Sequence, residues 1–481
     1  MNLERFPAGS VYPRSVTEVD GTGFALVRRD GAKLLVVQGN ADGFQGEWEG
    51  EHCFCPMSPA NATVLRQRLA WLRPQPLGVS KSAGCGDRLG LATPGHIRAF
   101  RRTGELAPIF AQQSMRENAR TGRSPQQVLD DAMWGVFQEG WHEAWGADAD
   151  HLKTTADIDL CVKAGYTFYT IDPGDHVDNE AHVAAKELLD SKVQSLPWDV
   201  LDDSPESLRG RYLSTQFELE EMELVFDDIS LARAAAKYGG AIAHTGEMYR
   251  HLVARMGSRV FELEVSVDET ETPTSPLEHY FVASELSRLG VQWVSLAPRY
   301  VGRFEKGVDY IGDLAEFDAA LAQHAAISRA LGPYKLSIHS GSDKFRVYPS
   351  FARHAGALVH LKTAGTSYLE ALRALAEAEP DLFRSVLSYA LERYAEDSAT
   401  YHVSADPGKV PLPESLPTEQ LAGVLDLFDG RQVLHVTFGS VVVRFGARLM
   451  AALEENEEVH YRALERHFIR HFEPFLRHKG V

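Results

Sequence analysis

Residues 145–176 read WGADADHLKTTADIDLCVKAGYTFYTIDPGDH. Two strand-like runs, 145–153 and 167–176, flank the amphipathic segment 156–165, and both runs end in polar or charged residues. Strands that alternate with helix-length segments are typical of a parallel sheet built from strand–helix–strand units. This stretch therefore predicts one such unit, with chemically active side chains where its strands end.

The same rhythm recurs on both sides of this unit. Helix-like segments separate the runs, and the segment 94–104 has Thr93 as its expected N-cap and Pro94 at its first helical position. Eight such units over about 300 residues predict an α/β fold, a TIM-type (β/α)₈ barrel, with a doubly wound sheet as the competing layout. The eight strand-like runs are 77–82, 106–113, 145–153, 167–176, 260–269, 293–300, 334–343 and 357–365.

Three further segments surround the predicted barrel, which we assign to residues 77–375. Residues 1–76 form a β-containing segment that ends in the helix-like run 63–74. Residues 178–230 are too long for an ordinary connection and are interpreted as an insertion after the fourth strand. Residues 376–481 are predicted to form a C-terminal helical extension, with a strand-like run at 432–437 between its helices.

Composition excludes several classes of protein. The 481 residues carry 49 Lys and Arg against 67 Asp and Glu, a net charge of −18, which argues against non-specific binding to nucleic acid. No stretch approaches the roughly 20 apolar residues that cross a bilayer, and the N-terminus lacks a secretory pattern. The four cysteines form no C-x-x-C motif. We expect a cytoplasmic protein without nucleic-acid or membrane partners, and leave a homo-oligomer open.

Polar residues gather where the predicted strands end, and in such barrels the catalytic groups come from these ends. Three histidines, His151, His339 and His360, lie at the ends of the third, seventh and eighth strands and could reach one divalent cation together with a carboxylate. The alternative is that each is a hydrogen-bonded core or loop histidine. Glu264 lies on the same strand face as Glu262, in the middle of a strand-like run, where an unpaired charge facing an apolar core is costly. We therefore favour a functional role for Glu264 over the alternative, a buried ion pair.

Other motifs are weaker. Gly84–Gly90 is a near miss to a dinucleotide fingerprint, so no nicotinamide cofactor is expected. His467 and His471, four residues apart, are interpreted as an ordinary helix face rather than a metal pair. His142 and Glu143 lack the second histidine of a zincin helix.

The strand-end motifs together resemble one family, the tagaturonate/fructuronate epimerases, also known as ketose 4-epimerases. The resemblance runs from about residue 80 to near the C-terminus, and the first 75 residues resemble the family only loosely. The motifs that carry it are GDRLGLATPGH (86–96), PIFAQQS (108–114), REN-x-RTGR (116–123), WGVFQEG (134–140), GADADHLK (146–153), TIDPGDHV (170–177), EVSVDETETPTSP (264–276), HSGSDKF-x-VYP (339–349), HLKTAGTSYLEA (360–371) and HVTFGSV (435–441).

This resemblance implies a metal-dependent interconversion of two hexuronates, D-tagaturonate and D-fructuronate. It makes Asp150 the expected proton acceptor and Glu264 the expected proton donor. It makes His151 and His339 ligands of a divalent cation, Zn²⁺, Mn²⁺ or Ni²⁺, with Glu305 as the third ligand and His360 as the alternative. The residues expected to bind substrate, four of them cations suited to its carboxylate, are Lys81, Gln113, Arg299, Lys344, His360 and Lys362.

The chemistry of these sugars narrows the mechanism. The two keturonates have the ketone at C2 and differ at C4, whose hydrogen is β to the ketone and cannot be removed by simple enolisation. Oxidation and reduction at C4 would need a nicotinamide, so we favour retro-aldol cleavage between C3 and C4. Alternatives are an epimerase or aldolase acting on neutral ketoses such as fructose and tagatose, a silent sugar-acid sensor, and a glycoside hydrolase, which needs no metal.

Overall fold

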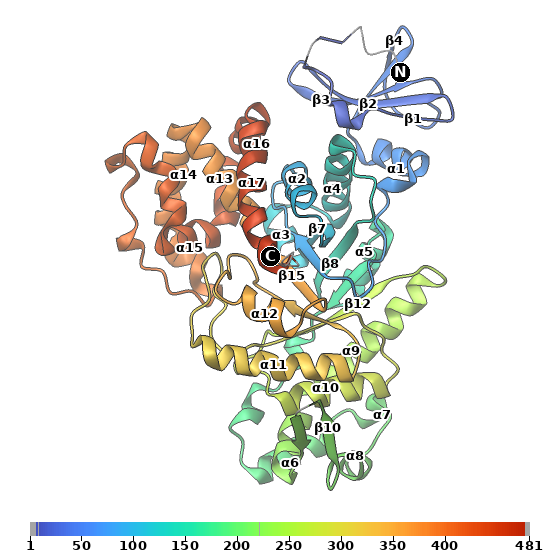
Figure 1. The fold of residues 1–481 in the computed structure, drawn as a ribbon, viewed down its shortest axis with the longest axis vertical. Helices are drawn as coiled ribbons and strands as arrows, with labels where there is room; N and C mark the ends of the chain where they lie inside the picture. Colours follow the sequence, from blue (N-terminus) through green and yellow to red (C-terminus); the bar gives the residue numbers. More distant parts are fainter. Residues whose placement is uncertain (1–5, 8, 221, 477–481) are drawn as a thin grey trace, which may run out of the picture.

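The computed structural model describes residues 6–7, 9–220 and 222–476, and a closed parallel barrel lies at its centre (Figure 1). The strands follow one another around the barrel in chain order, and β15 pairs with β6 to close it. The predicted barrel is therefore confirmed. Its eight strands are β6 Ser82–Cys85, β7 Ala107–Ser114, β8 Gly146–Leu152, β9 Phe168–Ile171, β12 Glu262–Val267, β13 Ser295–Pro298, β14 Lys335–Ile338 and β15 Val359–Thr363.

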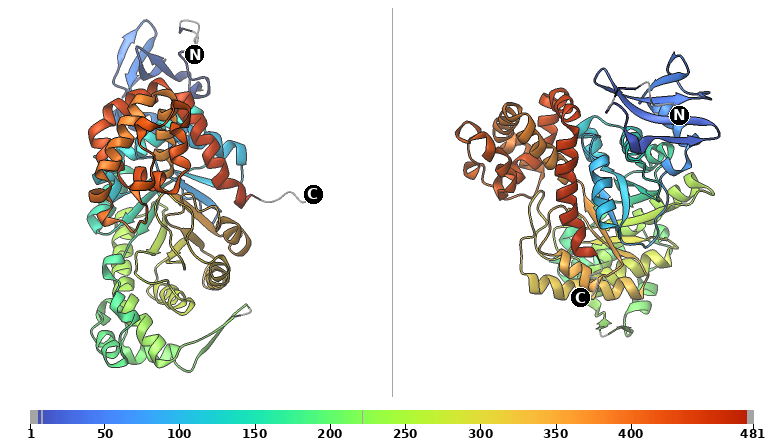
Figure 2. Two further views of the ribbon diagram at one scale, coloured as in Figure 1. Left: turned by 90° about the vertical axis from the view of Figure 1, so that its left-hand side faces the viewer. Right: turned by 45° about the horizontal axis from the view of Figure 1, so that its top comes forward.

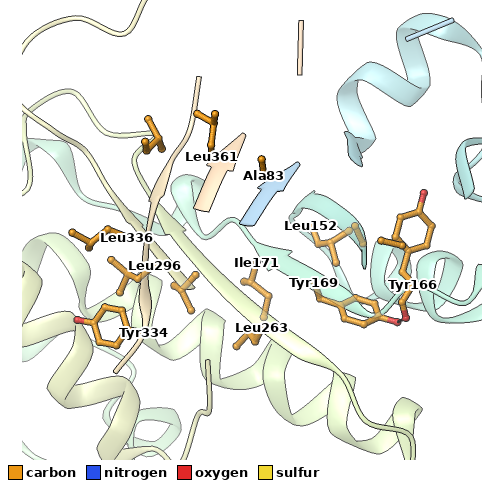
Figure 3. Packing of buried hydrophobic residues seen from close by; sticks show 14 of the residues in the cluster. Ala83, Leu152, Tyr166, Tyr169, Ile171, Leu263, Leu296, Tyr334, Leu336 and Leu361 are labelled. Carbon is orange, nitrogen blue, oxygen red and sulfur yellow. Dashed lines mark hydrogen bonds between the residues drawn. The ribbon is translucent and has the colours of Figure 1, made fainter. Parts of the chain in front are cut away.

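The two faces of the barrel strands differ in chemistry because successive side chains point to opposite sides. The outward set is apolar and belongs to the main hydrophobic core; Figure 3 shows part of it, including Leu263, Leu296 and Leu336. The inward set is polar, and a bond from Lys362 on β15 to Asp150 on β8 crosses the lumen. Branched apolar residues fill most barrels of this type, so a charged interior needs the ion pairs described below.

Helices cover the outside of the barrel, and their starts follow from local capping. Ser124 before α4 and Ser275 before α10 each form a capping box with the third helical residue. The helices of the barrel layer are α2 Thr93–Thr103, α3 Met115–Thr121, α4 Pro125–Glu139, α5 Thr155–Ala164, α9 Asp228–Met256, α10 Pro276–Arg288, α11 Leu314–Ala330, α12 Tyr348–His354 and α13 Thr366–Ala378.

Two local predictions differ from the structure. The first barrel strand is Ser82–Cys85 and not the predicted run 77–82. Its residues are small and have little strand preference, whereas the earlier run contains a valine that drew the prediction. Helix α2 begins one residue earlier than expected: Ala92 is the N-cap without a side-chain bond, and Thr93 is already helical.

The N-terminal segment contains β-strands, as the sequence predicted; they form an antiparallel sheet, and the helix that follows begins and ends earlier than the predicted run 63–74. Its strands pair in the order β1-β2-β3-β5-β4. Ser58 caps α1 by accepting a bond from the amide of Asn61. The elements are β1 Thr17–Val19, β2 Thr22–Arg29, β3 Ala32–Gln38, β4 Glu47–Glu49, β5 His52–Pro56 and α1 Pro59–Arg68.

The segment after β9 leaves the barrel and returns through the long helix α9. Figure 2 shows it at the end of the molecule opposite the N-terminal sheet, with the C-terminal helices along one side. Arg211 ties α8 to α10 through Glu285, at 3.2 Å. The elements of this segment are α6 Lys186–Gln194, α7 Trp198–Leu201, α8 Pro205–Tyr212, β10 Gln216–Leu219 and β11 Met222–Val225.

The C-terminal extension is helical, and α17 packs against α2 and α13. The strand predicted at 432–437 is wrong, because Phe428–Val436 forms helix α15. Val433, Leu434 and Val436 are buried in a second hydrophobic cluster, and this packing overrides the strand preference of valine. The helices are α14 Pro380–Asp397, α15 Phe428–Val436, α16 Phe438–Glu455 and α17 Glu457–Phe472.

Within the described parts of the chain, no single helix combines the length and the apolar character that a membrane crossing needs. Among the described residues, one pair of helices, α15 and α16, has the length and composition together, and this pair is bent by 76°.

Candidate active site

Lys362 lies near the carboxyl end of β15, at the centre of a buried ion cluster. Its Nζ is 2.8 Å from Asp148 Oδ2, 2.7 Å from Asp150 Oδ1 and 2.7 Å from Glu264 Oε1. It also donates a hydrogen bond to Thr170 Oγ1 at 2.7 Å. The cluster joins four strands across the lumen, β8, β9, β12 and β15, so closure of the barrel assembles it.

The shared ammonium group determines the charge of each member. Burial would lower the pKa of Lys362, but the three carboxylates raise that pKa well above its ordinary value. Burial raises the pKa of Asp148 to about 7. Burial acts in the same direction on Asp150 and Glu264, but the charge of Lys362 holds both pKa values well below their usual range. Lys362 is therefore a cation, and it cannot serve as the neutral amine that imine formation needs.

His339 directly follows β14 and touches the cluster through Glu264. Its Nε2 lies 2.6 Å from Glu264 Oε1, and its Nδ1 lies 3.1 Å from Asp268 Oδ1. The hydroxyl of Ser266 donates to the same Asp268 oxygen at 2.5 Å. Burial would lower the pKa of His339, but Asp268 and Glu264 outweigh it and raise the pKa to about 10.

His151 enters the same mouth because β8 is irregular at its end. The register between β8 and β9 shifts between Ala149 and Leu152, and His151 has a φ of 53°, which is uncommon for a residue with a side chain. This turn lets adjacent side chains share one cavity. The Nδ1 of His151 lies 3.0 Å from Asp172, and its Nε2 lies 3.8 Å from Asp150. Burial opposes protonation, but Asp150 and Asp172 raise its pKa to about 9.

The two imidazoles fit a divalent-cation site, and their ring centroids are 5.0 Å apart. In each ring a carboxylate contacts Nδ1, which leaves Nε2 on the side of Asp150 in His151 and of Glu264 in His339. Outer carboxylates of this kind orient metal-binding histidines and fix their tautomer. The five carboxylates in contact with Lys362 and the two imidazoles leave an excess of negative charge, which favours a cation.

Two groups of histidine and acidic side chains in the described residues bring their ligand atoms within 4.8 Å of one another. One adds Asp172 and Glu269 to His151 and belongs to the site above. The other is Asp343, His467 and His471, all buried between the β14 loop and α17. His467 contacts Asp343 Oδ1 at 2.6 Å, and the amide of Asp343 donates to His471 at 2.9 Å. These bonds anchor the loop that follows His339, so the two helix histidines are not an ordinary exposed face.

A cavity opens over this cluster at the carboxyl end of the barrel. Barrel strands and their loops supply most of its wall, and the C-terminal extension closes one side. Its lining residues are Arg88, Gln112, Ser114, Arg116, Glu117, Asp150, His151, Lys306, Gly307, His339, Ser340, Ser342, Lys362, Ala364, Gly365, Tyr401 and His435.

Known proteins resemble this chain over nearly its whole length. Residues 12–475 match a family model described as tagaturonate epimerase, UxaE. The chain belongs to the tagaturonate epimerase family. It is 44% identical over 470 residues to the tagaturonate/fructuronate epimerase of Thermotoga maritima, and the match covers 96% of each chain. Members of this family are isomerases that act on carbohydrates, and this chain is an enzyme of that class.

Solved structures of this family have the same fold. The native crystal structure of the fructuronate-tagaturonate epimerase UxaE from Cohnella laeviribosi superposes with a TM-score of 0.93 at 39% identity, covering 98% of both chains. A crystal structure of the same enzyme with one glycerol has a TM-score of 0.92, at 39% identity over 97% of this chain and 96% of that one.

The epimerase fold brings together five of the residues singled out from the sequence. Asp150, Glu264 and Lys362 form the ion cluster, and His151 and His339 border it. Four lie at or next to strand ends, as predicted. Glu264 also forms a buried ion pair, which was the alternative interpretation. A functional role and a buried ion pair are therefore compatible for this residue.

Neither candidate for a third metal ligand joins the two imidazoles. The carboxylate of Glu305 accepts bonds from Ser404 at 2.7 Å and Gln432 at 3.1 Å, and it is not among the cavity-lining residues. His360 lies within the barrel, where its Nδ1 contacts Ser82 Oγ at 2.9 Å. Asp172 and Glu269 are the carboxylates whose oxygens lie within 4.8 Å of a His151 ring nitrogen and of each other.

The expected substrate-binding residues are mostly outside the cavity. Lys81 precedes β6, at the opposite end of the barrel, because the first strand begins later than predicted; its ammonium contacts the carbonyl of Phe475. Gln113 points away from the lumen and bonds Thr121 at 3.2 Å. Its neighbour Gln112 lines the cavity and donates to Asp150 at 3.4 Å.

Two predicted cations have structural contacts instead. Arg299 follows β13 and donates to the carbonyl of Asp268 at 3.5 Å. Lys344 is buried and donates to three backbone carbonyls, those of Glu305, Val308 and Ser342. Burial lowers the pKa of Lys344 to about 7.

Sequence reasoning found Lys362 but missed three other cations that line the cavity, Arg88, Arg116 and Lys306. Arg88 follows β6 by three residues, so a correct end for that strand would have identified it. Lys306 lies in an irregular loop after β13, where no periodic signal exists. Arg116 lies in a quoted family motif that had no assigned role.

Proposed function

We propose that this enzyme interconverts D-tagaturonate and D-fructuronate by retro-aldol epimerisation at C4, with a divalent cation as cofactor. The observation that carries the proposal is the pair of carboxylates, Asp150 and Glu264, held by one ammonium group beside two imidazoles. The curated relative is named for this interconversion. A cytoplasmic location and a homo-oligomer remain predictions.

Carbon–carbon cleavage accounts for epimerisation at a carbon that enolisation cannot reach. Asp150 removes the proton of the C4 hydroxyl, the electrons of the C3–C4 bond pass into an enediolate, and C4 becomes an aldehyde. Rotation about the C4–C5 bond turns the other face of the aldehyde toward C3. The C3–C4 bond then forms again, and Glu264 donates a proton to the new C4 oxygen.

Two carboxylates are needed because the two epimers present the C4 oxygen on opposite sides. Lys362 lies 2.7 Å from an oxygen of each, so the proton taken up by Asp150 can reach Glu264 through one ammonium group. General acid–base catalysis requires contacts of this length. The barrel strands hold the groups before substrate arrives, which lowers the entropic cost of the encounter.

His151 and His339 are the residues that would hold the cation, with the neighbouring carboxylates completing the donor set. When bound, a divalent cation polarises the C2 ketone as a Lewis acid and stabilises the enediolate. Lys362 cannot replace this function by forming an imine, since it is held in its charged form.

Epimerisation in deuterated water is expected to leave the C4 hydrogen in place, because this hydrogen stays on its carbon throughout cleavage and re-addition. NMR of the isolated product measures the label at C4. Deuterium at that position would contradict the mechanism. A ¹³C isotope effect at both C3 and C4 separates bond cleavage from hydride transfer, which affects C4 but not C3.

Chelation is expected to abolish turnover, and addition of Mn²⁺, Zn²⁺ or Ni²⁺ to restore it. Asp268→Asn, which weakens the bond to His339 Nδ1, is expected to lower cation affinity by about 10- to 100-fold. Titration of the chelated enzyme with each cation measures this. Asp309→Asn, an acidic residue outside the cavity, is the control. Full activity after exhaustive chelation would contradict the cofactor assignment and favour a metal-free route.

Action on neutral ketoses is the second candidate, because C4 epimerisation of tagatose and fructose needs the same groups around C2 to C4. Comparable kcat/KM values for tagatose and tagaturonate would support it. The cations on the far wall of the cavity favour the uronates.

A further inference from the structure

We propose that Arg88 and Lys306 form the subsite that binds the substrate carboxylate, an inference that rests on the proposed function. Both line the cavity and neither belongs to the carboxylate–imidazole cluster. The sequence pointed to other cations, which the fold places elsewhere or engages in structural contacts.

Arg88 has an unused donor at this wall. Its side chain is 4% exposed, and its guanidinium stacks on Phe438, with 3.7 Å from Cζ to the ring centroid. Nε and Nη2 both bond Glu117, at 2.9 and 2.8 Å. Nη1 is buried without a hydrogen-bond partner. A buried donor without a partner is costly, so a ligand that accepts from Nη1 gains the bond without displacing another.

Lys306 supplies a second cation that lacks a carboxylate. Its Nζ donates to Ser340 Oγ at 2.6 Å, and no ion pair within the described residues includes it. Burial and the charge of Arg116 lower its pKa. Ser340 itself has a φ of 50°, so the β14 loop turns sharply to present its hydroxyl here. An anion bound beside Lys306 would stabilise the charged form of its ammonium group.

Arg116 adds a further positive charge to this wall. It lies at the rim, paired with Glu269 only at 3.8 Å. His435 lines the same side but adds no charge, because burial together with the charges of Arg88 and Lys306 holds its pKa well below the ordinary value. The cavity therefore has two kinds of wall. One is acidic and carries the imidazoles, and the other is basic and carries Arg88 and Lys306. A keturonate has the same polarity, with its hydroxyketone at one end and its carboxylate at the other.

Arginine and lysine side chains that line one cavity can bind a planar anion through charge-assisted hydrogen bonds. Counting Glu117 against Arg88 and Glu269 against Arg116 leaves one net positive charge on this wall, which matches a carboxylate better than the double charge of a sugar phosphate. We therefore assign the subsite to a carboxylate, with the phosphate as an outcome of the test.

The test compares ligands that differ at C6 alone. Affinities for D-tagaturonate, D-tagatose and D-tagatose 6-phosphate are measured by calorimetry in the slow Glu264→Gln background. Adding Lys306→Gln keeps a donor for Ser340 but removes the charge, and Arg88→Lys keeps the charge beside Glu117 but removes the fork. Lys163→Gln removes the same charge from an exposed residue in the last turn of α5, outside the lining, and serves as the control.

Lys306→Gln is expected to weaken tagaturonate binding by at least about 20-fold, since a bond to a charged group is lost, and to change tagatose binding less than about 3-fold. Arg88→Lys is expected to act in the same direction. Equal losses for both sugars, no loss for either, or tighter binding of the phosphate would overturn the subsite. Conversion of tagaturonate by the unmodified enzyme tests the proposed function separately: its absence contradicts the function, whereas conversion with undiminished uronate affinity in Lys306→Gln contradicts only the subsite.

Discussion

Glu264→Gln is expected to lower kcat for epimerisation by about 1,000-fold, which is the size of effect that a general acid or base contributes. The substitution keeps the shape of a fully buried side chain and removes its proton-carrying group. Because the equilibrium constant is a property of the two sugars, tagaturonate and fructuronate turnover must fall by the same factor in kcat/KM. Initial rates measured in both directions check this.

Glu262→Gln is the matched control, because Glu262 lies two residues earlier on the same face of β12, toward the amino end of the barrel. Burial raises its pKa, and it accepts a bond from the amide of Gly78, far from the imidazoles. We expect kcat within about 3-fold of the unmodified enzyme. A loss in Glu264→Gln no larger than in this control would show that Glu264 is structural, held for its pairing with Lys362.

The sequence predicts the barrel well because polar or charged residues mark the ends of most of its strands. Asp150, His151 and His339 each lie at or next to the end of a run with strand character, and parallel strands in a closed barrel present those ends at one mouth. The first strand is the exception. Its residues Ala83, Gly84 and Cys85 have little strand preference, so the sequence analysis placed the strand in the valine-containing run before them. That shift of a few residues moved the expected cation from Arg88 to Lys81.

Sequence periodicity does not predict the irregular features of the site. A strict alternation would separate Asp150 from His151, and only the left-handed turn at His151 brings both into the cavity. Such backbone strain gathers at functional sites and depends on the surrounding packing. Lys306 lies in a loop without a repeating pattern. The position of His435 depends on α15, whose strand-like sequence folds as a helix because its apolar residues are buried by the C-terminal cluster.

Lys362→Met is expected to abolish epimerisation and to lower the free energy of unfolding by about 3–5 kcal/mol, because it leaves three buried carboxylates without their shared cation. Thermal unfolding followed by circular dichroism measures the loss of stability. The loss of unfolding free energy depends on pH. Burial raises the pKa of Asp148 to about 7, above its unfolded value, so its protonated form favours the folded state and the penalty grows as the pH rises through about 7.

The double variant Lys362→Met with Asp148→Asn separates charge from packing. If the cost of Lys362→Met arises from unneutralised charge, removing one carboxylate recovers part of the stability, and the two substitutions are strongly non-additive. Asp148 has no assigned step in the reaction, so activity stays lost while stability returns. Additive losses would mean that the packing of the Lys362 side chain matters more than its ammonium group. The ammonium that neutralises the barrel interior would then have no special part in joining Asp150 to Glu264.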